Sequence, residues 1–225
     1  MSQNENNELK FKKKGGASKV RVTVLGRFIV YFPFLHLSVI IFAFYASYLS
    51  VHWMMPVFIL AAIYLFPMLA HRLHDLFFPL TDERVIIPNG QYPAWWGSYQ
   101  IQYIFISIPA LEAPLRLIPG LYSAWLRAWG SQIGRRVVWP PMLEITDRSL
   151  MVIGDGSVIG HHTGFYCHVL NPTKDGRLLL YVKKIVIGKY CFIGSGSRIG
   201  PGNTIPDMTK LDVLTDLRIS PSPKL

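Results

Sequence analysis

The sequence has little cysteine, and it lacks the spacings by which cysteine organises small folds. Its 225 residues include only Cys167 and Cys191, which are too few for a disulfide framework and carry no zinc-site spacing. We therefore expect a reducing compartment and small buried side chains at both positions. The chain also lacks a recognisable nucleic-acid-binding motif, although its formal net charge is +10. Where the cations lie therefore matters more than their sum.

Asp, Glu, Lys and Arg are absent from residues 28–70, which form two apolar runs, 28–50 and 51–70. Each run is near the ~20 residues that an apolar helix needs to cross a bilayer. A cleaved signal peptide has a shorter apolar core, and the second run argues against one. The pattern predicts two transmembrane helices with a turn near residues 50–53. A pair of buried core helices is the alternative.

The cations gather before the first apolar run. Residues 1–27 contain seven Lys or Arg residues against two Glu, and their polar, aperiodic sequence predicts a mostly disordered arm. This basic arm, together with Arg72 after the second run, predicts that both ends lie in the cytoplasm by the positive-inside rule. The arm also suits anionic lipid headgroups. We expect a protein of the cytoplasmic (inner) membrane, with its C-terminal part facing the cytoplasm and no nucleic-acid partner.

Residues 71–132 lack a clean period. Pro109, Pro114 and Pro119 interrupt an aromatic and apolar stretch too often for a further span. Trp95 and Trp96 fit an interfacial aromatic belt. The run GLYSAWLRAWG, residues 120–130, predicts one short amphipathic helix whose apolar residues share a face. We expect residues 71–132 to be interfacial amphipathic helices that lie in the membrane surface, and a cap packed on the next domain is the alternative.

Residues 133–220 lack the periods of a helix and of an ordinary strand, and show a period of six instead. An aliphatic residue stands at each sixth position, at Ile187, Ile193, Ile199, Ile205, Leu211 and Leu217. One inward aliphatic residue in six is typical of one side of a triangular prism, so three sides make a coil of about 18 residues. No single coil buries its apolar residues, but a stack of coils does. The period therefore predicts a mainly β fold, a parallel β-helix in which residues one coil apart stack in the core.

The same frame runs backwards along the chain with one interruption. Ile153, Ile159 and Phe165 form an earlier coil, and Ile133 and Ile145 indicate a less regular entry coil. The next core residue after Phe165 comes 16 residues late, which predicts a loop over 171–186. A glycine follows the core residue in the regular coils, at Gly154, Gly160, Gly188, Gly194 and Gly200. Such glycines suit tight corners, and the last coil lacks them.

The motifs VIGDGSVIG (152–160) and IVIGKYCFIGSGSRIGPG (185–202), with CH (167–168) before the loop, resemble those of the hexapeptide-repeat acyltransferases, the left-handed parallel β-helix family. EITDRSLMVIGDG and PGLYSAWLRAWGSQIG further resemble uncharacterised membrane-associated members of that family. The resemblance implies a left-handed coil and a homotrimer with sites between prisms. It also implies transfer of an acyl group to a hydroxyl or amine. The donor is acyl-CoA or an acyl carrier protein thioester, which is a co-substrate rather than a bound cofactor.

The resemblance implies a histidine general base beside the loop, and His168 in FYCHVLNPT holds that place. An imidazole that titrates near neutral pH can take the proton of a hydroxyl as it attacks a thioester. His168 is the fourth residue of its hexad, so we expect it to face solvent. His162 takes the same place on the preceding side and His161 adjoins it, so either is an alternative base or substrate ligand. Asn171 and Tyr166 flank His168 and are candidates to orient it or the acceptor.

Candidates for the donor site lie at the end of the loop and in the coil that follows it. The resemblance implies that the donor arm runs along the corner at Gly194 and Ser195, where backbone amides can also stabilise an oxyanion. Cations suited to the phosphates of CoA, or to the acidic surface of a carrier protein, are Lys183, Lys184, Lys189 and Arg198. Ordinary solvated side chains are the alternative for each of these cations.

These features favour a membrane-anchored O-acyltransferase with a lipid-linked or glycosidic acceptor, because enzyme and acceptor in one surface meet at high effective concentration. A non-catalytic, membrane-tethered scaffold or complex subunit is one alternative, favoured by the last coil without glycines. A zinc-dependent carbonic anhydrase is another, since one branch of the fold binds zinc through three histidines, and His161, His162 and His168 supply that number. Because His162 and His168 hold equivalent places on adjacent sides, they should diverge, and we expect no metal site.

Overall fold

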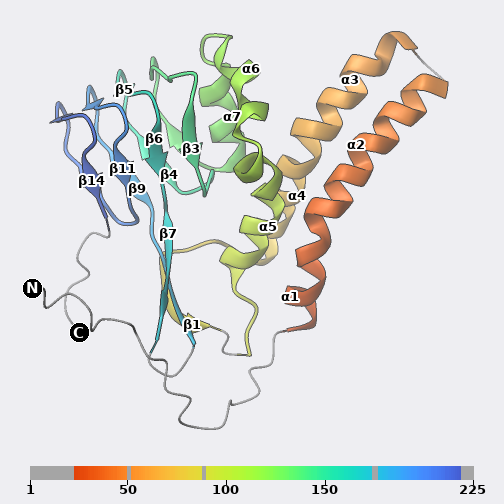
Figure 1. Ribbon diagram of the computed structural model, residues 1–225, viewed down its shortest axis with the longest axis horizontal. Helices are drawn as coiled ribbons and strands as arrows, with labels where there is room; N and C mark the ends of the chain where they lie inside the picture. The colour runs from red at the N-terminus through yellow and green to blue at the C-terminus, as the bar shows by residue number, and fades with distance from the viewer. Residues whose placement is uncertain (1–22, 50–51, 88–89, 174–176, 219–225) are drawn as a thin grey trace, which may run out of the picture.

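The computed structural model describes residues 23–49, 52–87, 90–173 and 177–218. Residues 1–22 of the basic arm and residues 50–51 of the predicted turn lie outside these ranges. Figure 1 shows two long helical segments on one side, shorter helices in the middle, and a stack of short strands on the other side. A hairpin of longer strands projects from this stack.

The two apolar runs form two helical segments. The first comprises α1 (Val24–Phe28), η1 (Ile29–Tyr31) and α2 (Phe32–Leu49), and the second comprises η2 (His52–Met54), α3 (Met55–Leu60), η3 (Ala61–Leu65) and α4 (Phe66–Phe77). The first begins four residues earlier than predicted, because the Thr23 hydroxyl accepts a hydrogen bond from the Gly26 amide and caps α1. The second continues past residue 70 to Phe77.

Both segments are long and apolar enough to cross a membrane, by length and composition. Only 6% of the first segment and 17% of the second, taken over the most apolar stretch of each, are buried inside the protein. In Figure 1, α2 and α3 extend away from the strands. This exposure does not fit the alternative of two buried core helices.

The hexapeptide region forms three parallel sheets, each on one side of a prism. Their strands, in order along each sheet, are β2-β4-β9-β12, β5-β10-β13 and β3-β6-β11-β14. The strands are β2 (Gln132–Ile133), β3 (Leu143–Ile145), β4 (Met151–Ile153), β5 (Val158–Ile159), β6 (Thr163–Phe165), β9 (Ile185–Ile187), β10 (Phe192–Ile193), β11 (Arg198–Ile199), β12 (Thr204–Ile205), β13 (Lys210–Leu211) and β14 (Asp216–Leu217). Because consecutive strands take the three sides in turn, the fold is a parallel β-helix, and its left hand stays a prediction.

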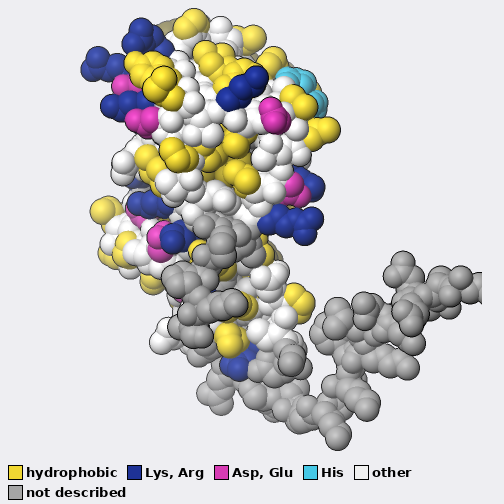
Figure 2. All heavy atoms as spheres, turned by 90° about the vertical axis from the view of Figure 1, so that its left-hand side faces the viewer, with side chains coloured by type: hydrophobic (Ala, Val, Ile, Leu, Met, Phe, Trp, Pro, Cys, Tyr) yellow, Lys and Arg dark blue, Asp and Glu magenta, His cyan; other side chains and the backbone are white. Residues whose placement is uncertain are grey.

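The core registers confirm the predicted stacking. The pairs are Ile187 with Ile205, Ile193 with Leu211, and Ile199 with Leu217. Cys167 and Cys191 are free and buried, as expected. Leu211 and Leu217 remain partly exposed because no further described coil covers them. Figure 2 looks onto this end of the prism, where hydrophobic side chains lie among basic and acidic ones.

The glycines that follow core residues allow stacking rather than turning, so the predicted reason for them was wrong. A Cβ at Gly154 would lie 2.6 Å from the backbone carbon of Gly188 in the next coil. Left-handed backbone occurs two residues later, at Gly156, and the last coil adopts it without glycine at Met208 and Leu214, both with φ of 59°. The last coil needs no glycine after its core residues because no described coil stacks on it. Its loss of glycine therefore does not favour the scaffold alternative.

The predicted loop 171–186 is a β-hairpin. It consists of β7 (His168–Pro172) and β8 (Leu178–Val182), and β1 (Glu83–Ile87) pairs with β8 to make a three-stranded antiparallel sheet. The excursion begins at His168, earlier than predicted, and the chain is back in the prism at Ile185. Leu180 and Val182 of β8 lie in the core, and Val85 and Ile87 of β1 pack against it, which holds β1 against the hairpin.

The segment between the apolar helices and the prism is a packed cap. It contains α5 (Ala94–Ser107), η4 (Pro109–Glu112), α6 (Ala113–Arg116) and α7 (Leu121–Trp129). Trp95 was assigned to an interfacial belt, but it is buried because α5 lies between the apolar helices and the strands. Leu126 and Trp129 of α7 are also buried in the common core. The packing matches the cap alternative for these faces, and contact of residues 71–132 with a membrane surface stays a prediction.

Candidate active site

His168 forms a hydrogen-bonded pair with a residue that the sequence interpretation missed. Its Nδ1 lies 2.7 Å from Oδ2 of Asp147, whose side chain is fully buried. β3 pairs with β6 so that Ile145 lies beside Phe165, and two residues beyond this pair the chain brings Asp147 next to the start of β7. Thr146 donates a second hydrogen bond to the same oxygen, at 2.7 Å. The sequence feature that could have indicated Asp147 is the polar run Thr146-Asp147-Arg148 between two strands of core residues.

Helix α5 covers His168. The rings of Trp95 and Tyr99 lie 4.5 and 5.5 Å from the His168 ring, centroid to centroid, and the His168 side chain is 14% exposed. The expectation that it faces solvent was therefore wrong. The hexad frame ends where the chain leaves the prism, and His168 belongs to β7 instead. Burial, with smaller contributions from Tyr103 and Asp147, raises the pKa of Tyr99, so this phenol stays neutral beside the imidazole.

The bond to Asp147 determines what the imidazole can do. A carboxylate at Nδ1 favours the tautomer that carries its proton there, which leaves the lone pair of Nε2 free to accept a proton. When His168 becomes protonated, the same carboxylate stabilises the imidazolium. The arrangement is that of a general base held by a buried acid.

The two predicted orienting residues do not contact His168. The Tyr166 hydroxyl donates to Oε2 of Glu144 at 2.8 Å, and burial, followed by this bond, raises the pKa of Tyr166 to about 12. Asn171 lies three residues after His168 on β7, so its side chain is on the opposite face of the sheet. Asp147 takes the orienting place that these residues were assigned.

His161 and His162 lie together at a different, exposed corner. Their rings are 4.2 Å apart, and His162 has a φ of 57°. His162 lines a cavity of about 520 Å³ with Glu144 and Arg116, so it remains available as a substrate ligand. In the described ranges, no three His, Cys, Asp or Glu side chains are grouped to hold a metal ion. The three histidines therefore do not form the ligand set of the zinc alternative.

The donor-site candidates are dispersed over the prism. The Gly194 amide donates to the Leu211 carbonyl at 3.1 Å, so coil stacking already uses it, while Ser195 is exposed at the adjoining corner. Lys183, Lys184 and Lys189 are exposed, and the Lys184 and Lys189 amides bond Asp82 and Asp207.

Arg198 lies on β11, beside Gly164 of β6, the strand that precedes His168. It pairs with Asp216 at 2.9 Å and lines a groove of about 400 Å³ together with Tyr166, Val169 and Arg218. Tyr166 and Val169 stand on either side of His168 along the chain. The groove therefore adjoins β7, but Val169 is one residue from His168 and lies on the opposite face of that strand.

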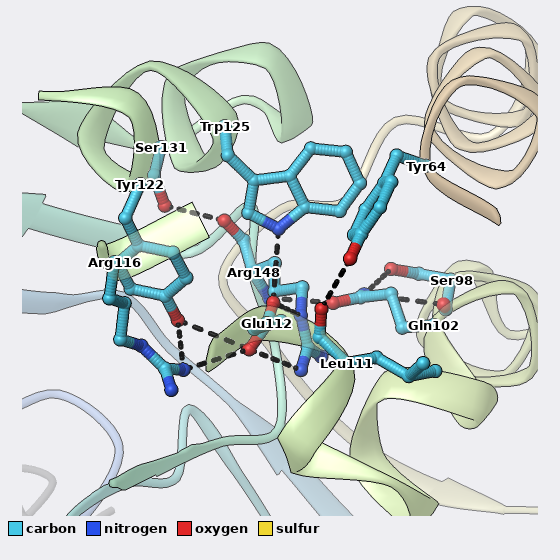
Figure 3. A network of polar contacts seen from close by, with 10 residues as sticks. All are labelled: Tyr64, Ser98, Gln102, Leu111, Glu112, Arg116, Tyr122, Trp125, Ser131 and Arg148. Carbon is cyan, nitrogen blue, oxygen red and sulfur yellow. Dashed lines mark hydrogen bonds and ion pairs between the residues drawn. The ribbon is translucent and has the colours of Figure 1, made fainter. Parts of the chain in front are cut away.

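A second buried charged cluster lies next to the pair and joins the cap to the prism (Figure 3). Oε1 of Glu112 accepts hydrogen bonds from Arg148 and Trp125 at 2.6 and 3.0 Å, and Oε2 accepts from Arg148, Arg116 and Tyr122 at 3.1 to 3.3 Å. Burial by itself would raise the pKa of Glu112, but the guanidinium of Arg148 and these bonds outweigh it and lower the pKa. Glu112 is therefore ionised and fully paired.

The sequence matches no protein-family model and no curated protein. Among solved structures, the chain is similar to a hexapeptide-repeat-containing acetyltransferase from Vibrio cholerae, with 19% identity and a TM-score of 0.31 over 50% of this chain and 83% of that one. It is also similar to serine acetyltransferase isoform 3 from Entamoeba histolytica, solved in complex with cysteine, with 12% identity and a TM-score of 0.25 over 75% and 74% of the two chains. Likeness at this level carries no argument about function, and the fold rests on the strand registers of this chain.

Proposed function

We propose that the protein is a membrane-anchored acyltransferase that moves an acyl group from a thioester to a hydroxyl of a lipid-linked or glycosidic acceptor. The observation that carries the proposal is the His168–Asp147 pair, an imidazole held by a buried carboxylate where the chain leaves a hexapeptide prism. The hexapeptide motifs resemble those of acyltransferases, and the pair supplies the general base that this reaction needs.

The pair supports acyl transfer through a tetrahedral intermediate. Nε2 of His168 takes the proton of the acceptor hydroxyl, and the oxygen forms a bond to the carbonyl carbon of the thioester. The tetrahedral intermediate then expels the thiolate sulfur, which receives the proton from Nε2 as the carbon–sulfur bond breaks. Asp147 stabilises the imidazolium between these two steps. Trp95 and Tyr99 exclude water from one side of the ring, which disfavours hydrolysis of the thioester.

The donor would bind in the groove beside Tyr166 and Arg198, with Arg198 next to the phosphates of CoA or to an acidic carrier protein. By the family resemblance, the coil is left-handed and the molecule is a homotrimer in which a neighbouring prism completes this groove. Residues 133–220 then form the catalytic domain, and residues 71–132 connect it to the anchor.

The anchor would be the hairpin of the two apolar helices, residues 28–70 with the extensions described above, in the cytoplasmic membrane. The uncovered apolar surface of both helices supports this assignment, and the basic residues before the first helix support a cytoplasmic catalytic domain. Such an anchor would hold the cap and His168 close to the membrane surface. A membrane lipid would therefore be the acceptor that reaches the site at the highest effective concentration.

Thioester turnover by the purified full chain in nanodiscs tests the proposal. Acetyl-CoA, longer acyl-CoAs and acyl carrier protein thioesters are offered with a membrane lipid extract, to wild type and to His168→Ala. We expect release of free thiol together with a mass-shifted lipid, both lost in the variant. No consumption of any donor by the wild type would reject the enzyme in favour of a scaffold, and unchanged turnover in the variant would transfer the base to His162 or His161.

A further inference from the structure

A cavity of about 600 Å³ lies where the first apolar helix meets the cap and the hairpin. Its lining includes Gly26, Arg27 and Val30 from the start of the first helical segment, Trp96 from α5, and Ile87 and Leu178 from the sheet. The lining is mainly apolar, and Arg27 is a charged side chain within it. The cavity is thus built by three segments that lie far apart in the sequence.

The cavity is tied together by a direct bond and is continuous with the surface of the apolar helix. The indole Nε1 of Trp96 donates to the Gly26 carbonyl at 3.3 Å, which holds α5 against α1. Val30 and Tyr31 line the cavity and also belong to the exposed apolar surface of the first helical segment. These two side chains therefore connect the cavity to the apolar surface of the helix.

The cavity and the His168 pair lie on the same face of the β1-β8-β7 sheet. Paired residues of neighbouring strands share a face, and so do residues two apart on one strand. His168 pairs with Val182, and Pro172 pairs with Leu178, which in turn pairs with Ile87. His168 and the cavity residues Leu178 and Ile87 are therefore on one face, four residues apart along the strands, or about 13 Å at ~3.3 Å per residue.

Aromatic side chains of α5 connect the two places over that face. Trp96 lines the cavity, its ring centroid is 6.0 Å from that of Trp95, and Trp95 contacts His168 at 4.5 Å. Trp95 and Leu180, which lies between Leu178 and Val182 on the same face, are buried and fill the space between the cavity and the imidazole. A ligand with one end in the cavity therefore extends along the sheet toward His168 only when these side chains move aside.

We infer that this cavity binds the hydrocarbon chain of the acceptor lipid and directs its hydroxyl-bearing end toward His168, an inference that rests on the proposed acyl transfer. The apolar lining suits a hydrocarbon chain, and Arg27 favours a lipid with an anionic group beside that chain. The acceptor class is therefore an anionic, hydroxyl-bearing membrane lipid.

Photo-crosslinking in nanodiscs tests the inference independently of turnover. The probe is phosphatidylglycerol with a diazirine near the end of one chain, diluted in phosphatidylcholine, and labelled peptides are identified by mass spectrometry. We expect labelling of the β1 and β8 peptides, which lie outside the apolar helices. Leu178→Trp fills the cavity and should lose this labelling, whereas the matched control Leu179→Trp, on the opposite face of the same strand, should keep it. Val30→Trp provides a second cavity-filling variant should Leu178→Trp fail to fold.

The outcomes separate this inference from the proposed function. Labelling confined to the apolar helices, or equal labelling of Leu178→Trp and Leu179→Trp, overturns the inference while turnover stands. Labelling of β1 and β8 without turnover of any thioester rejects the enzyme and keeps the cavity as a lipid site. A loss of turnover in Leu178→Trp with long-chain donors but not with acetyl-CoA would assign the cavity to the donor chain, which also overturns the inference.

Discussion

Asp147 and Arg148 are consecutive and both buried, yet they serve two different regions. Arg148 reaches Glu112 in the cap, where each carboxylate oxygen accepts at least two hydrogen bonds. Asp147 reaches His168, and its Oδ1 has no hydrogen-bond partner among the described residues. Nη1 of Arg148 also lacks a partner within the described part of the chain, so the completely paired group is the Glu112 carboxylate. A carboxylate whose two oxygens are both paired holds two regions together, whereas one with a free oxygen beside a partly exposed imidazole can respond to a reaction. Glu112 and Asp147 therefore differ in how completely their oxygens are paired.

Removing the imidazole should have the largest effect on turnover. His168→Ala should lower thioester turnover by about 10²- to 10⁴-fold, because a positioned general base contributes that much. Its thermal unfolding in detergent should stay close to that of the wild type. A variant that retains turnover, or one that loses turnover only because it unfolds, would contradict the assignment of His168 as the base.

Glu112→Gln should show the opposite pattern. The substitution leaves Arg148 buried without a counter-ion, which we expect to lower the free energy of unfolding by about 3–5 kcal/mol. Chemical denaturation in detergent, followed by tryptophan fluorescence, measures the change. Turnover per folded molecule, measured below the unfolding transition, should change much less than in His168→Ala. A loss of turnover without a loss of stability would place Glu112 in the reaction instead.

Asp147→Asn tests whether the acid acts through the histidine. The amide keeps the size of the side chain but cannot stabilise an imidazolium, so turnover should fall by up to about 10⁴-fold. Because Asp147 would be a positioning residue, the pH profile of turnover should change as well as its height. An equal loss at every pH, with a matching loss of stability, would reduce Asp147 to a structural role.

The stability of the cap should depend on pH through Glu112. The neighbouring guanidinium of Arg148 holds the pKa of Glu112 in the folded protein below its ordinary value of 4.5. Ionised Glu112 therefore contributes stability that is fully present above that value and is lost as pH falls through the folded pKa. The difference in unfolding free energy between wild type and Glu112→Gln should therefore shrink as pH falls below 4.5. A difference that stays constant down to acid pH would mean that pairing is not its origin.

The smallest effect is expected at the surface pair of the donor groove. Arg198 and Asp216 are 2.9 Å apart, but their side chains are 64% and 32% exposed, and such pairs contribute about 0–1 kcal/mol. Asp216→Asn should leave unfolding nearly unchanged, which makes it the control for Glu112→Gln. The apparent affinity for the donor is measured separately, because Asp216→Asn removes the partner of Arg198 and leaves its guanidinium free to bind phosphates. A large loss of stability in Asp216→Asn would show that burial does not explain the difference in stability between the Glu112 cluster and the Arg198–Asp216 pair.

The prism was predictable in detail because its rule is local. One inward aliphatic residue in six, repeated along the chain, predicted the pairs that the sheets show, such as Ile187 with Ile205. The apolar helices were predictable for the same kind of reason, since their composition alone distinguishes them. The ends were less predictable, because the cap at Thr23 and the extension to Phe77 depend on single contacts.

The candidate site was predicted only in part. His168 was chosen from its place before an interruption in the period, but the same period wrongly predicted that it faces solvent. Asp147 and Trp95 reach it from 21 and 73 residues away, and no local pattern links these positions. The sequence interpretation did not predict β1, because this five-residue strand is stabilised by pairing with β8, which lies far along the chain.

The period of the prism, its core registers, the two apolar helices and the position of one histidine all follow from the spacing of residues along the chain. Four features depend on how distant segments pack: α5 covers that histidine, Asp147 bonds it, Glu112 joins the cap to the prism, and a cavity lies between α1 and the hairpin. Each of these features is a contact between segments that lie far apart in the sequence. Their energy comes from burial and hydrogen bonding across the fold, which the order of residues within any one segment does not record.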